Sequence, residues 1–462
     1  MIMKKITVEE ILIATKGELL SGSLENTIEG VSIDSREVKS NEVFFPIIGE
    51  RHDAHDFIPQ AIKRGCTTIM TAKQLTLDLS KESVDIILVE DTTKALQDLA
   101  AYYLSLFPVK KIAVTGSTGK TTTKEMLYWI FSEKYKTVRN LGNFNNHIGL
   151  PLSVFALDEN TQAGIFEMGM SELGEIHLLA NLVRPDIGII TNIGSSHLEN
   201  LGSRENILKA KMEITDFFNE ENILIVNDDQ ELLSRQYTEG NYRLITTGET
   251  GKSSFILSNI NDLGEDGIEF MLEHQLEAQH YKINIPGRHN AYNAALAIAA
   301  AVECGLTQEE AARGLAKMEL TDKRLSIKGK NGMKIIDDTY NASPDSMKAA
   351  IDVLMSTKGV RRIAILGDMF ELGDQSDQYH FEIGKYAGEK GADQVIAVGR
   401  AAEHIAKGAR TFLDESKVIH YDIKELLINE LDRIISSGDV ILIKGSRGMA
   451  MDKIVKRIME KE

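Results

Sequence analysis

The sequence predicts an α/β fold in three domains, as the chain length and two stretches of alternating strand-like and helix-like segments indicate. The chain has 462 residues, more than one compact core accommodates, because domains usually have about 100–200 residues. Residues 92–321 and 322–462 each alternate short apolar runs with longer amphipathic segments, a pattern typical of α/β domains. Residues 1–91 mix short apolar runs with turn-rich polar pieces, and we expect a smaller α/β domain there.

The first zone contains two segments with strand character. The stretch VSIDSREVKSNEVFFPIIGE (31–50) predicts a strand, a loop and a second strand. The zone closes on the run DIILVED (85–91), which predicts a further strand.

Four apolar runs in the middle zone are typical of strands buried on both faces of a parallel sheet. They are KIAVTGS (111–117), GIFEMGM (164–170), DIGIITNIG (186–194) and NILIVND (222–228). Helical segments separate these runs, so we expect a doubly wound sheet. Residues 251–285 alternate polar and apolar side chains instead, and predict an antiparallel insertion.

The third zone predicts a second α/β domain, Rossmann-like in outline. Helical patterns separate five strand candidates, which are MKIIDD (333–338), RRIAILGD (361–368), DQVIAVG (393–399), KVIHYD (417–422) and DVILIKG (439–445).

Composition and charge argue against several classes of function. The formal net charge of −17 argues against non-specific nucleic-acid binding, which needs clustered Lys and Arg. The N-terminus lacks a continuous apolar core, and no stretch approaches the roughly 20 apolar residues that span a bilayer. We therefore expect a cytoplasmic protein without membrane insertion. Its two cysteines, Cys66 and Cys304, lie far apart and are predicted to be reduced structural thiols.

The segment VTGSTGKTTTKEM (114–126) is the most informative functional signal. A strand-like run enters a glycine-rich turn that opens a helix, and backbone N–H groups in such a turn cradle phosphate oxygens. Lys120 is placed to reach the β and γ phosphates of ATP, and the Thr121 hydroxyl to bind Mg²⁺. The loop is shorter than the standard GxxxxGK[ST], because Val114 stands where the first glycine is expected. The predicted ATP-binding residues are Gly116, Ser117, Thr118, Gly119, Lys120, Thr121 and Thr122.

Two further side chains follow strands of the same predicted sheet. Glu167 ends the strand GIFE, and His197 lies in the loop after IITNIG. Because the carboxyl ends of parallel strands face the ligand crevice, both are predicted ligands of an Mg²⁺ bound with ATP. Lys211 lies in the helical run SRENILKAKMEI, and its spacing alone favours an ordinary solvated lysine.

Taken in order, these and further segments resemble the Mur ligase family. After the phosphate loop come NFNNHIGLP (143–151), EMGMSELGEI (167–176), TNIGSSHLENLGSRENILKAKMEI (191–214), GRHNAYNAALAIAAA (287–301), KRL (323–325), DDTYNASPDSM (337–347) and LGDMFELGDQSDQYH (366–380). Together they are far more specific than any single motif.

The resemblance implies roles for residues of the ATP and metal site. Thr121, Glu167 and His197 match Mg²⁺ ligands, and Lys211 matches a lysine that Mur ligases carry as a carbamate, an anionic ligand of a second Mg²⁺. The implied catalytic residues are Lys120, His197, Lys211 and Arg324.

The resemblance also implies contacts with the substrates. Asn290 matches a residue that contacts adenine, and Arg324 and Asp338 match residues of the third domain that reach the γ-phosphate and the ribose. The residues implied to hold the UDP end and to line the substrate side are Ser35, Arg36, Asn143 and Asn146.

The resemblance further implies a UDP-binding domain at 1–91, a central ATPase domain at 92–321 and a ligase domain at 322–462. The implied enzyme is a monomer that joins D-alanyl-D-alanine to UDP-N-acetylmuramoyl-tripeptide, with ATP and Mg²⁺, through an acyl-phosphate in peptidoglycan precursor synthesis. No nucleic acid is implied as a partner.

Alternatives remain open at the level of sequence. The chain fits a nucleotide-driven switch whose ATPase activity needs no peptide acceptor. Within ligases, it fits a member that adds a single amino acid, or a folylpolyglutamate synthetase. The Asn-Pro-Arg tripeptide of the diaminopimelate-adding members is absent. Asp53-Ala54-His55 replaces the family's usual Asp-Gly-His, which leaves the detailed shape of the UDP pocket open.

Overall fold

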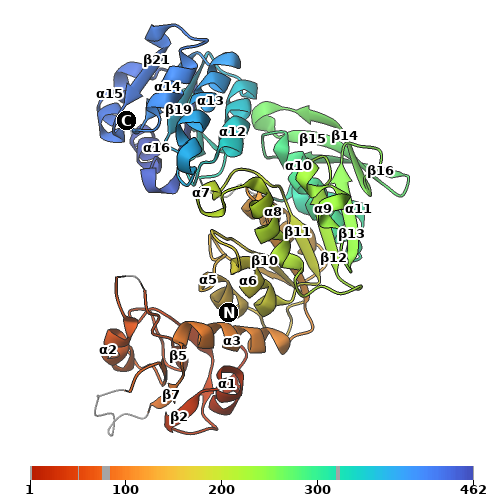
Figure 1. The fold of residues 1–462 in the computed structure, drawn as a ribbon, viewed down its shortest axis with the longest axis vertical. Coiled ribbons are helices and arrows are strands. Elements are labelled where there is room, and N and C mark those ends of the chain that lie inside the picture. Colours follow the sequence, from red (N-terminus) through yellow and green to blue (C-terminus); the bar gives the residue numbers. More distant parts are fainter. Residues whose placement is uncertain (1–2, 50, 75–83, 319–322, 461–462) are drawn as a thin grey trace.

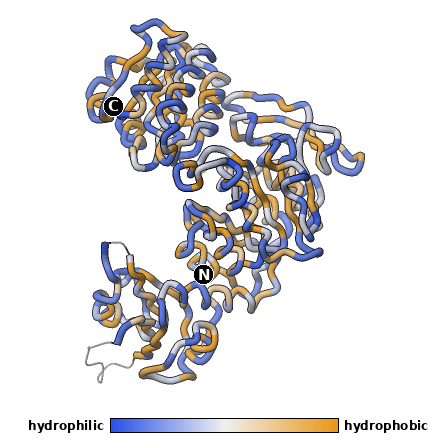
Figure 2. Tube along the Cα trace, in the orientation of Figure 1, coloured by the Kyte–Doolittle hydropathy of each residue, from blue (hydrophilic) through white to orange (hydrophobic). Residues whose placement is uncertain are grey.

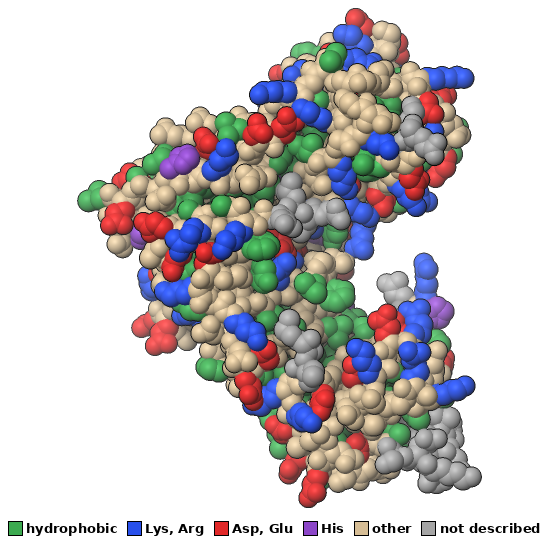
Figure 3. All heavy atoms as spheres, turned by 180° about the vertical axis from the view of Figure 1, so that it is seen from behind, with side chains coloured by type: hydrophobic (Ala, Val, Ile, Leu, Met, Phe, Trp, Pro, Cys, Tyr) green, Lys and Arg blue, Asp and Glu red, His purple; other side chains and the backbone are tan. Residues whose placement is uncertain are grey.

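Three large β-sheets follow one another along the chain in the computed structural model, which describes residues 3–49, 51–74, 84–318 and 323–460. The N-terminal and C-terminal sheets lie at opposite ends of an elongated molecule, with the nine-stranded central sheet between them (Figure 1). Seen from behind, a wide notch separates the N-terminal part from the C-terminal part (Figure 3). The predicted three-domain α/β architecture is confirmed.

The N-terminal part contains a five-stranded sheet and a two-stranded ribbon. The sheet has the order β2 (Glu18–Ser21), β7 (Asp85–Leu88), β6 (Thr68–Thr71), β5 (Glu42–Phe44) and β4 (Gly30–Ser32). Its strands are parallel except for β2. The ribbon pairs β1 (Ile6–Thr7) with β3 (Thr27–Ile28), and the helices are α1 (Val8–Thr15) and α2 (Ile58–Lys63). The strands predicted in 31–50 and 85–91 are present, except that residue 50 lies outside the described residues.

The central sheet has β8 at its topological switch point. Its order is β16 (Glu277–Ile283), β15 (Ile268–His274), β14 (Phe255–Asp262), β13 (Arg243–Gly248), β12 (Ile223–Asn227), β11 (Ile187–Ile190), β8 (Lys110–Thr115), β10 (Ala163–Glu167) and β9 (Thr137–Arg139). Strands β8 to β14 are parallel, and β15 and β16 are antiparallel as predicted for 251–285. Ligands of such sheets bind beside the strand where the connections change direction.

Both faces of the central sheet are covered by helices. Adjacent residues of a strand point to opposite faces of the sheet, so each strand contributes side chains to both cores. Ile112 and Val114 of β8 pack into the cluster that contains α4 (Lys120–Phe131), α10 (His289–Glu303) and α11 (Gln308–Ala316). Ala113 packs into the opposite cluster. The remaining helices are α3 (Thr92–Ser105), α5 (Gly149–Val154), α6 (Glu175–Val183), α7 (Leu198–Leu201), α8 (Arg204–Met212) and α9 (Arg235–Thr238).

One hydrophobic core joins the N-terminal part to the central sheet. It runs from Ile11 of α1 through Leu96 and Leu99 of α3 to Phe166 of β10. The boundary predicted between residues 91 and 92 coincides with the start of α3. Because α3 packs against both the N-terminal part and the central sheet, the boundary stays a prediction. The boundary predicted at 321 and 322 lies outside the described residues.

The C-terminal sheet has six strands, parallel except at one edge. Its order is β17 (Ser326–Lys330), β18 (Met333–Asp338), β22 (Asp439–Lys444), β19 (Arg361–Gly367), β20 (Gln394–Val398) and β21 (Val418–Tyr421). The covering helices are α12 (Pro344–Ser356), α13 (Ser376–Glu389), α14 (Glu403–Ala409), α15 (Lys424–Ile434) and α16 (Asp452–Met459). All five predicted strands are present. Apolar stretches of the chain run through the interior of this part (Figure 2). Among the described residues, no helix is long and apolar enough to cross a membrane.

Candidate functional site

A cavity of about 710 Å³ lies between the central and the C-terminal parts of the chain. Residues predicted from the sequence line it from both sides. From the central part come Ser117, Thr118, Gly119, Lys120, Thr121, Thr122, Asn146, Glu167, His197 and Asn290, and from the C-terminal part Arg324 and Asp338. The cavity is therefore formed only when the two parts are together.

The phosphate loop connects β8 to α4 and depends on two glycines with positive φ. Gly116 has φ 148°, and a side chain there would place its Cβ 1.8 Å from Thr191 Oγ1. Gly119, with φ 78°, precedes α4, whose N-terminus has no side-chain cap. The first N–H groups of α4 thus lack a capping side chain, and such groups bind phosphate.

Lys120 is the first residue of α4, and its side chain folds back over the loop. Its Nζ donates to Gly116 O at 2.6 Å and to Ser117 O at 3.3 Å. Burial lowers the pKa of Lys120, as does the charge of Arg324, whereas Glu167 opposes the shift. These two carbonyl oxygens are neutral acceptors. A phosphate group in the cavity would give the Lys120 ammonium group an anionic partner, which forms stronger hydrogen bonds.

Glu167 ends β10, the strand next to β8, and both of its carboxylate oxygens have partners. Thr121 Oγ1 donates to Oε2 at 2.8 Å, and Asn145 Nδ2 donates to Oε1 at 2.8 Å. Burial raises the pKa of Glu167, but the charges of Lys124, Arg324 and Lys120 outweigh it and lower the pKa overall. A carboxylate beside a hydroxyl offers the hard oxygen ligands that Mg²⁺ prefers, so these two residues fit the predicted ion.

His197 lines the same cavity, but its ring is held by the C-terminal part. Its Nδ1 lies 2.6 Å from Glu371 Oε2, close enough for an ion pair although not aligned as a hydrogen bond. His197 and Glu371 both have left-handed backbones, with φ 62° and 63°. Within the described ranges, no three His, Cys, Asp or Glu side chains are grouped as a metal site. The role of His197 as an Mg²⁺ ligand stays a prediction.

Lys211 is not the solvated lysine that its spacing alone favours. It is 1% exposed, in α8, and does not line the cavity. Burial lowers the pKa of Lys211 well below its usual value, and the nearby charge of Lys120 lowers it further. The described residues provide it with no carboxylate within ion-pair distance.

Arg324 and Asp338 come from the C-terminal part. The Arg324 guanidinium lies 4.0 Å from the ring centre of Tyr340. Its positive charge lowers the pKa of both Glu167 and Lys120. Asp338 ends β18 and accepts from Lys444 Nζ at 2.5 Å. Both residues thus line the cavity from the C-terminal part, and their contacts with ATP stay a prediction.

Asn290 lies at the start of α10, where its Nδ2 donates to Pro286 O at 2.7 Å. The neighbouring His289 also lines the cavity, and sequence reasoning missed it. Burial lowers the pKa of His289 to about 4, so its ring is neutral near pH 7. Its place in GRHN, directly before Asn290, was the available signal.

Some predicted substrate residues are outside the cavity. Asn146 lines it and accepts from Gly149 N at 2.8 Å, whereas Asn143 is exposed and does not line it. Ser35 is buried and donates to Gln60 Oε1 at 2.8 Å. Arg36 is exposed and pairs with Asp34 at 2.6 Å. Both belong to the N-terminal part and are not brought to the phosphate loop.

The chain matches known proteins along nearly all of its length. Residues 27–104 match the model "Mur ligase family, catalytic domain", residues 114–301 "Mur ligase middle domain" and residues 323–447 "Mur ligase, glutamate ligase domain". A UDP-N-acetylmuramoyl-tripeptide--D-alanyl-D-alanine ligase of Bacillus subtilis (strain 168) is 41% identical, over 99% of each chain.

The chain belongs to the Mur ligase family. Solved structures agree: MurF from Acinetobacter baumannii superposes with a TM-score of 0.91 and 31% identity, covering 99% of this chain and 100% of that one. MurF from Thermotoga maritima, solved with ADP, has a TM-score of 0.82 and 29% identity, covering 93% and 97%. As a Mur ligase, the chain is an ATP-dependent ligase, which confirms the predicted enzyme class.

Proposed function

We propose that this Mur ligase joins D-alanyl-D-alanine to UDP-N-acetylmuramoyl-tripeptide in peptidoglycan precursor synthesis. The observation that carries the proposal is the cavity in which a phosphate-binding loop faces Arg324 of the C-terminal part. The choice of substrates is supported by the full-length similarity to relatives that carry this name.

The reaction has two steps. An oxygen of the tripeptide's terminal carboxylate attacks the γ-phosphorus of ATP, and the bond from that phosphorus to ADP breaks. The amine of D-alanyl-D-alanine then attacks the acyl carbon, the bond from that carbon to the phosphate oxygen breaks, and the amine loses a proton. Because all reacting groups of the first step are anionic, it needs positive charge, which Lys120 and Arg324 are placed to supply.

Mg²⁺ fits the site beside Thr121 and Glu167, where it would neutralise phosphate charge when bound. We assign His197 to the same ion and carbamylated Lys211 to a second one. An amine reacts with CO₂ only when neutral, and the lowered pKa of Lys211 favours that form. Carbamylation would turn a buried amine, which has no ion-pair partner among the described residues, into an anion near Lys120, which supports the assignment.

The UDP end of the substrate is assigned to Ser35 and Arg36, and its reacting end to the segment with Asn143 and Asn146. The acceptor is assigned to the segment 366–380, whose Glu371 already contacts His197. Because the reaction consumes ATP, we place it in the cytoplasm. We propose a monomer, since one chain supplies both sides of the cavity.

Phosphate release should require the correct acceptor. With UDP-N-acetylmuramoyl-tripeptide and ATP, D-alanyl-D-alanine should support turnover, whereas lysine, diaminopimelate, glutamate or single D-alanine should not. A coupled assay of phosphate release measures this directly. Faster turnover with a single amino acid on the UDP-linked dipeptide would instead indicate an enzyme of the preceding step. Full-rate hydrolysis without any acceptor would indicate a nucleotide-driven switch.

A further inference from the structure

Lys124 is a buried lysine that does not touch the cavity. It lies in α4, four residues after Lys120 and three after Thr121, so the three side chains share one side of the helix. Its side chain is 0% exposed, and its Nζ donates to Asn140 O at 2.9 Å and to Gly142 O at 3.4 Å. Burying a cation is costly unless it is paired and hydrogen-bonded, so these contacts offset a large penalty.

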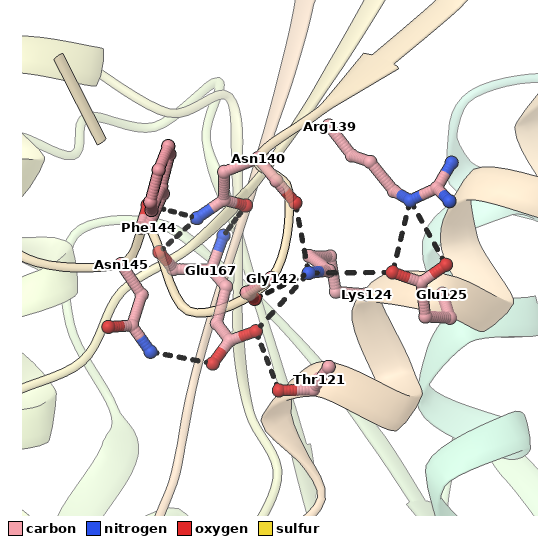
Figure 4. Close-up of polar contacts among 9 residues, drawn as sticks. All are labelled: Thr121, Lys124, Glu125, Arg139, Asn140, Gly142, Phe144, Asn145 and Glu167. Atoms are coloured by element: carbon pink, nitrogen blue, oxygen red, sulfur yellow. Dashed lines mark hydrogen bonds and ion pairs between the residues drawn. The ribbon is translucent and has the colours of Figure 1, made fainter. Parts of the chain in front are cut away.

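The Nζ of Lys124 also lies between two carboxylates. It is 3.6 Å from Glu167 Oε2 and 3.4 Å from Glu125 Oε1. Glu125 is in turn paired with Arg139 at 3.0 Å and contacts neither Glu167 nor the segment 140–146 in any hydrogen bond of the described residues. The contacts of Lys124 therefore form two sets (Figure 4). Those with Glu167 and the segment 140–146 are directed at the site, whereas the contact with Glu125 is directed away from it.

Asn140 holds the backbone of Glu167. Its Oδ1 accepts from Glu167 N at 2.9 Å, and its Nδ2 donates to Glu167 O at 3.0 Å and to Phe144 O at 2.8 Å. Asn145 binds the Glu167 carboxylate from the same segment. Segment 140–146 and the end of β10 thus form one hydrogen-bonded unit, and Lys124 ties this unit to α4 (Figure 4).

We propose that Lys124 is a positioning residue, which fixes Glu167 and the segment 140–146 to the phosphate helix so that the ATP loop and the substrate-lining segment keep one geometry. This inference rests on the proposed function, because it concerns the same reaction. Lys124 acts only through its partners, since it does not line the cavity, whereas Glu167, Asn145 and Asn146 do.

The variant Lys124→Met tests this, because it keeps the length of the side chain and removes its charge and donors. We expect kcat to fall about 10-fold or more, the usual effect of losing a group that orients a metal ligand. We also expect a higher KM for UDP-N-acetylmuramoyl-tripeptide. In the ligand-free protein, backbone amides of residues 141–147 should exchange hydrogen faster than in wild type.

The matched control is Glu125→Gln, which removes the charge of the other buried carboxylate beside Lys124, on the same helix. It should leave kcat and the exchange of residues 141–147 near wild type. If both variants lose activity and melting temperature equally, with exchange unchanged, Lys124 only stabilises the fold and the proposal is overturned.

Two further outcomes are separable. If wild type forms no dipeptide adduct, the proposed function fails, while the exchange measurement still decides the role of Lys124 because it needs no turnover. If Lys124→Met does not fold, Lys124→Gln replaces it, since its amide can donate but carries no charge. Unchanged exchange and kcat in that variant would likewise overturn the proposal.

Discussion

Replacement of Lys120 by alanine is expected to reduce turnover by about 10²–10³-fold, the effect of removing one charged donor from a transition state. Lys120 begins the phosphate helix, lines the cavity and has no carboxylate within ion-pair distance among the described residues. Its ammonium group is therefore available for the γ-phosphate. Steady-state phosphate release with saturating substrates measures the effect, and the melting temperature reports whether the variant is folded.

A structural role for Lys120 makes a different prediction. Its Nζ donates to the carbonyl groups of Gly116 and Ser117, so it also holds the loop. Lys120→Gln keeps a donor but loses the charge. If Lys120→Gln retained near wild-type turnover, holding the loop would be sufficient and Lys120 would not stabilise transferred phosphate.

Replacement of Lys211 by alanine is expected to lower turnover by about 100-fold, at the upper end of the effects seen for groups that orient or bind a catalytic metal. If Lys211 functions as a carbamate, the variant loses an anion, and added acetate should partly restore activity by occupying the space. Titration of acetate against the variant's rate measures this, with chloride at equal ionic strength as the salt control.

The neighbouring Lys209 provides the control for this experiment. It lies on the same helix, α8, but is exposed, so Lys209→Ala should keep wild-type turnover and show no response to acetate. Unimpaired turnover of Lys211→Ala would show that Lys211 is a buried amine without a role in catalysis. Equal acetate effects on both variants would argue against a vacated anion site.

The sequence predicts the parts of the site that strand ends determine. Glu167 is buried at the end of β10, beside the phosphate loop at the end of β8, as parallel pairing requires. Apolar runs predicted β8, β10, β11 and β12 of the central sheet, whereas β1, β2, β3, β6, β9, β13 and β17 were missed. β17 has the sequence SIKGK, which carries two lysines. It is an edge strand with only one neighbouring strand, and such strands commonly carry charged side chains.

Contacts that depend on irregular backbone or on the packing of two domains could not be predicted from residue spacing. In NFNNHIGLP, the sequence predicts Asn143 and Asn146 as substrate-side residues, whereas the structure shows that Asn145 contacts Glu167. The spacing of residues does not determine where a loop side chain points. Lys124 looks like any lysine of an amphipathic helix until its burial is known. The contact of His197 with Glu371 joins residues far apart in sequence, and only the docking of two domains reveals it.

The fate of the substrate's carboxylate oxygens tests the ligase mechanism most directly. UDP-N-acetylmuramoyl-tripeptide labelled with ¹⁸O in its terminal carboxylate should transfer one labelled oxygen to each phosphate released, because the acyl carbon to oxygen bond breaks when the amine attacks. Mass spectrometry of the phosphate measures the transfer. Unlabelled phosphate from this substrate, together with labelled phosphate formed in ¹⁸O-water, would show that ATP is simply hydrolysed and would contradict an acyl-phosphate intermediate in this cavity.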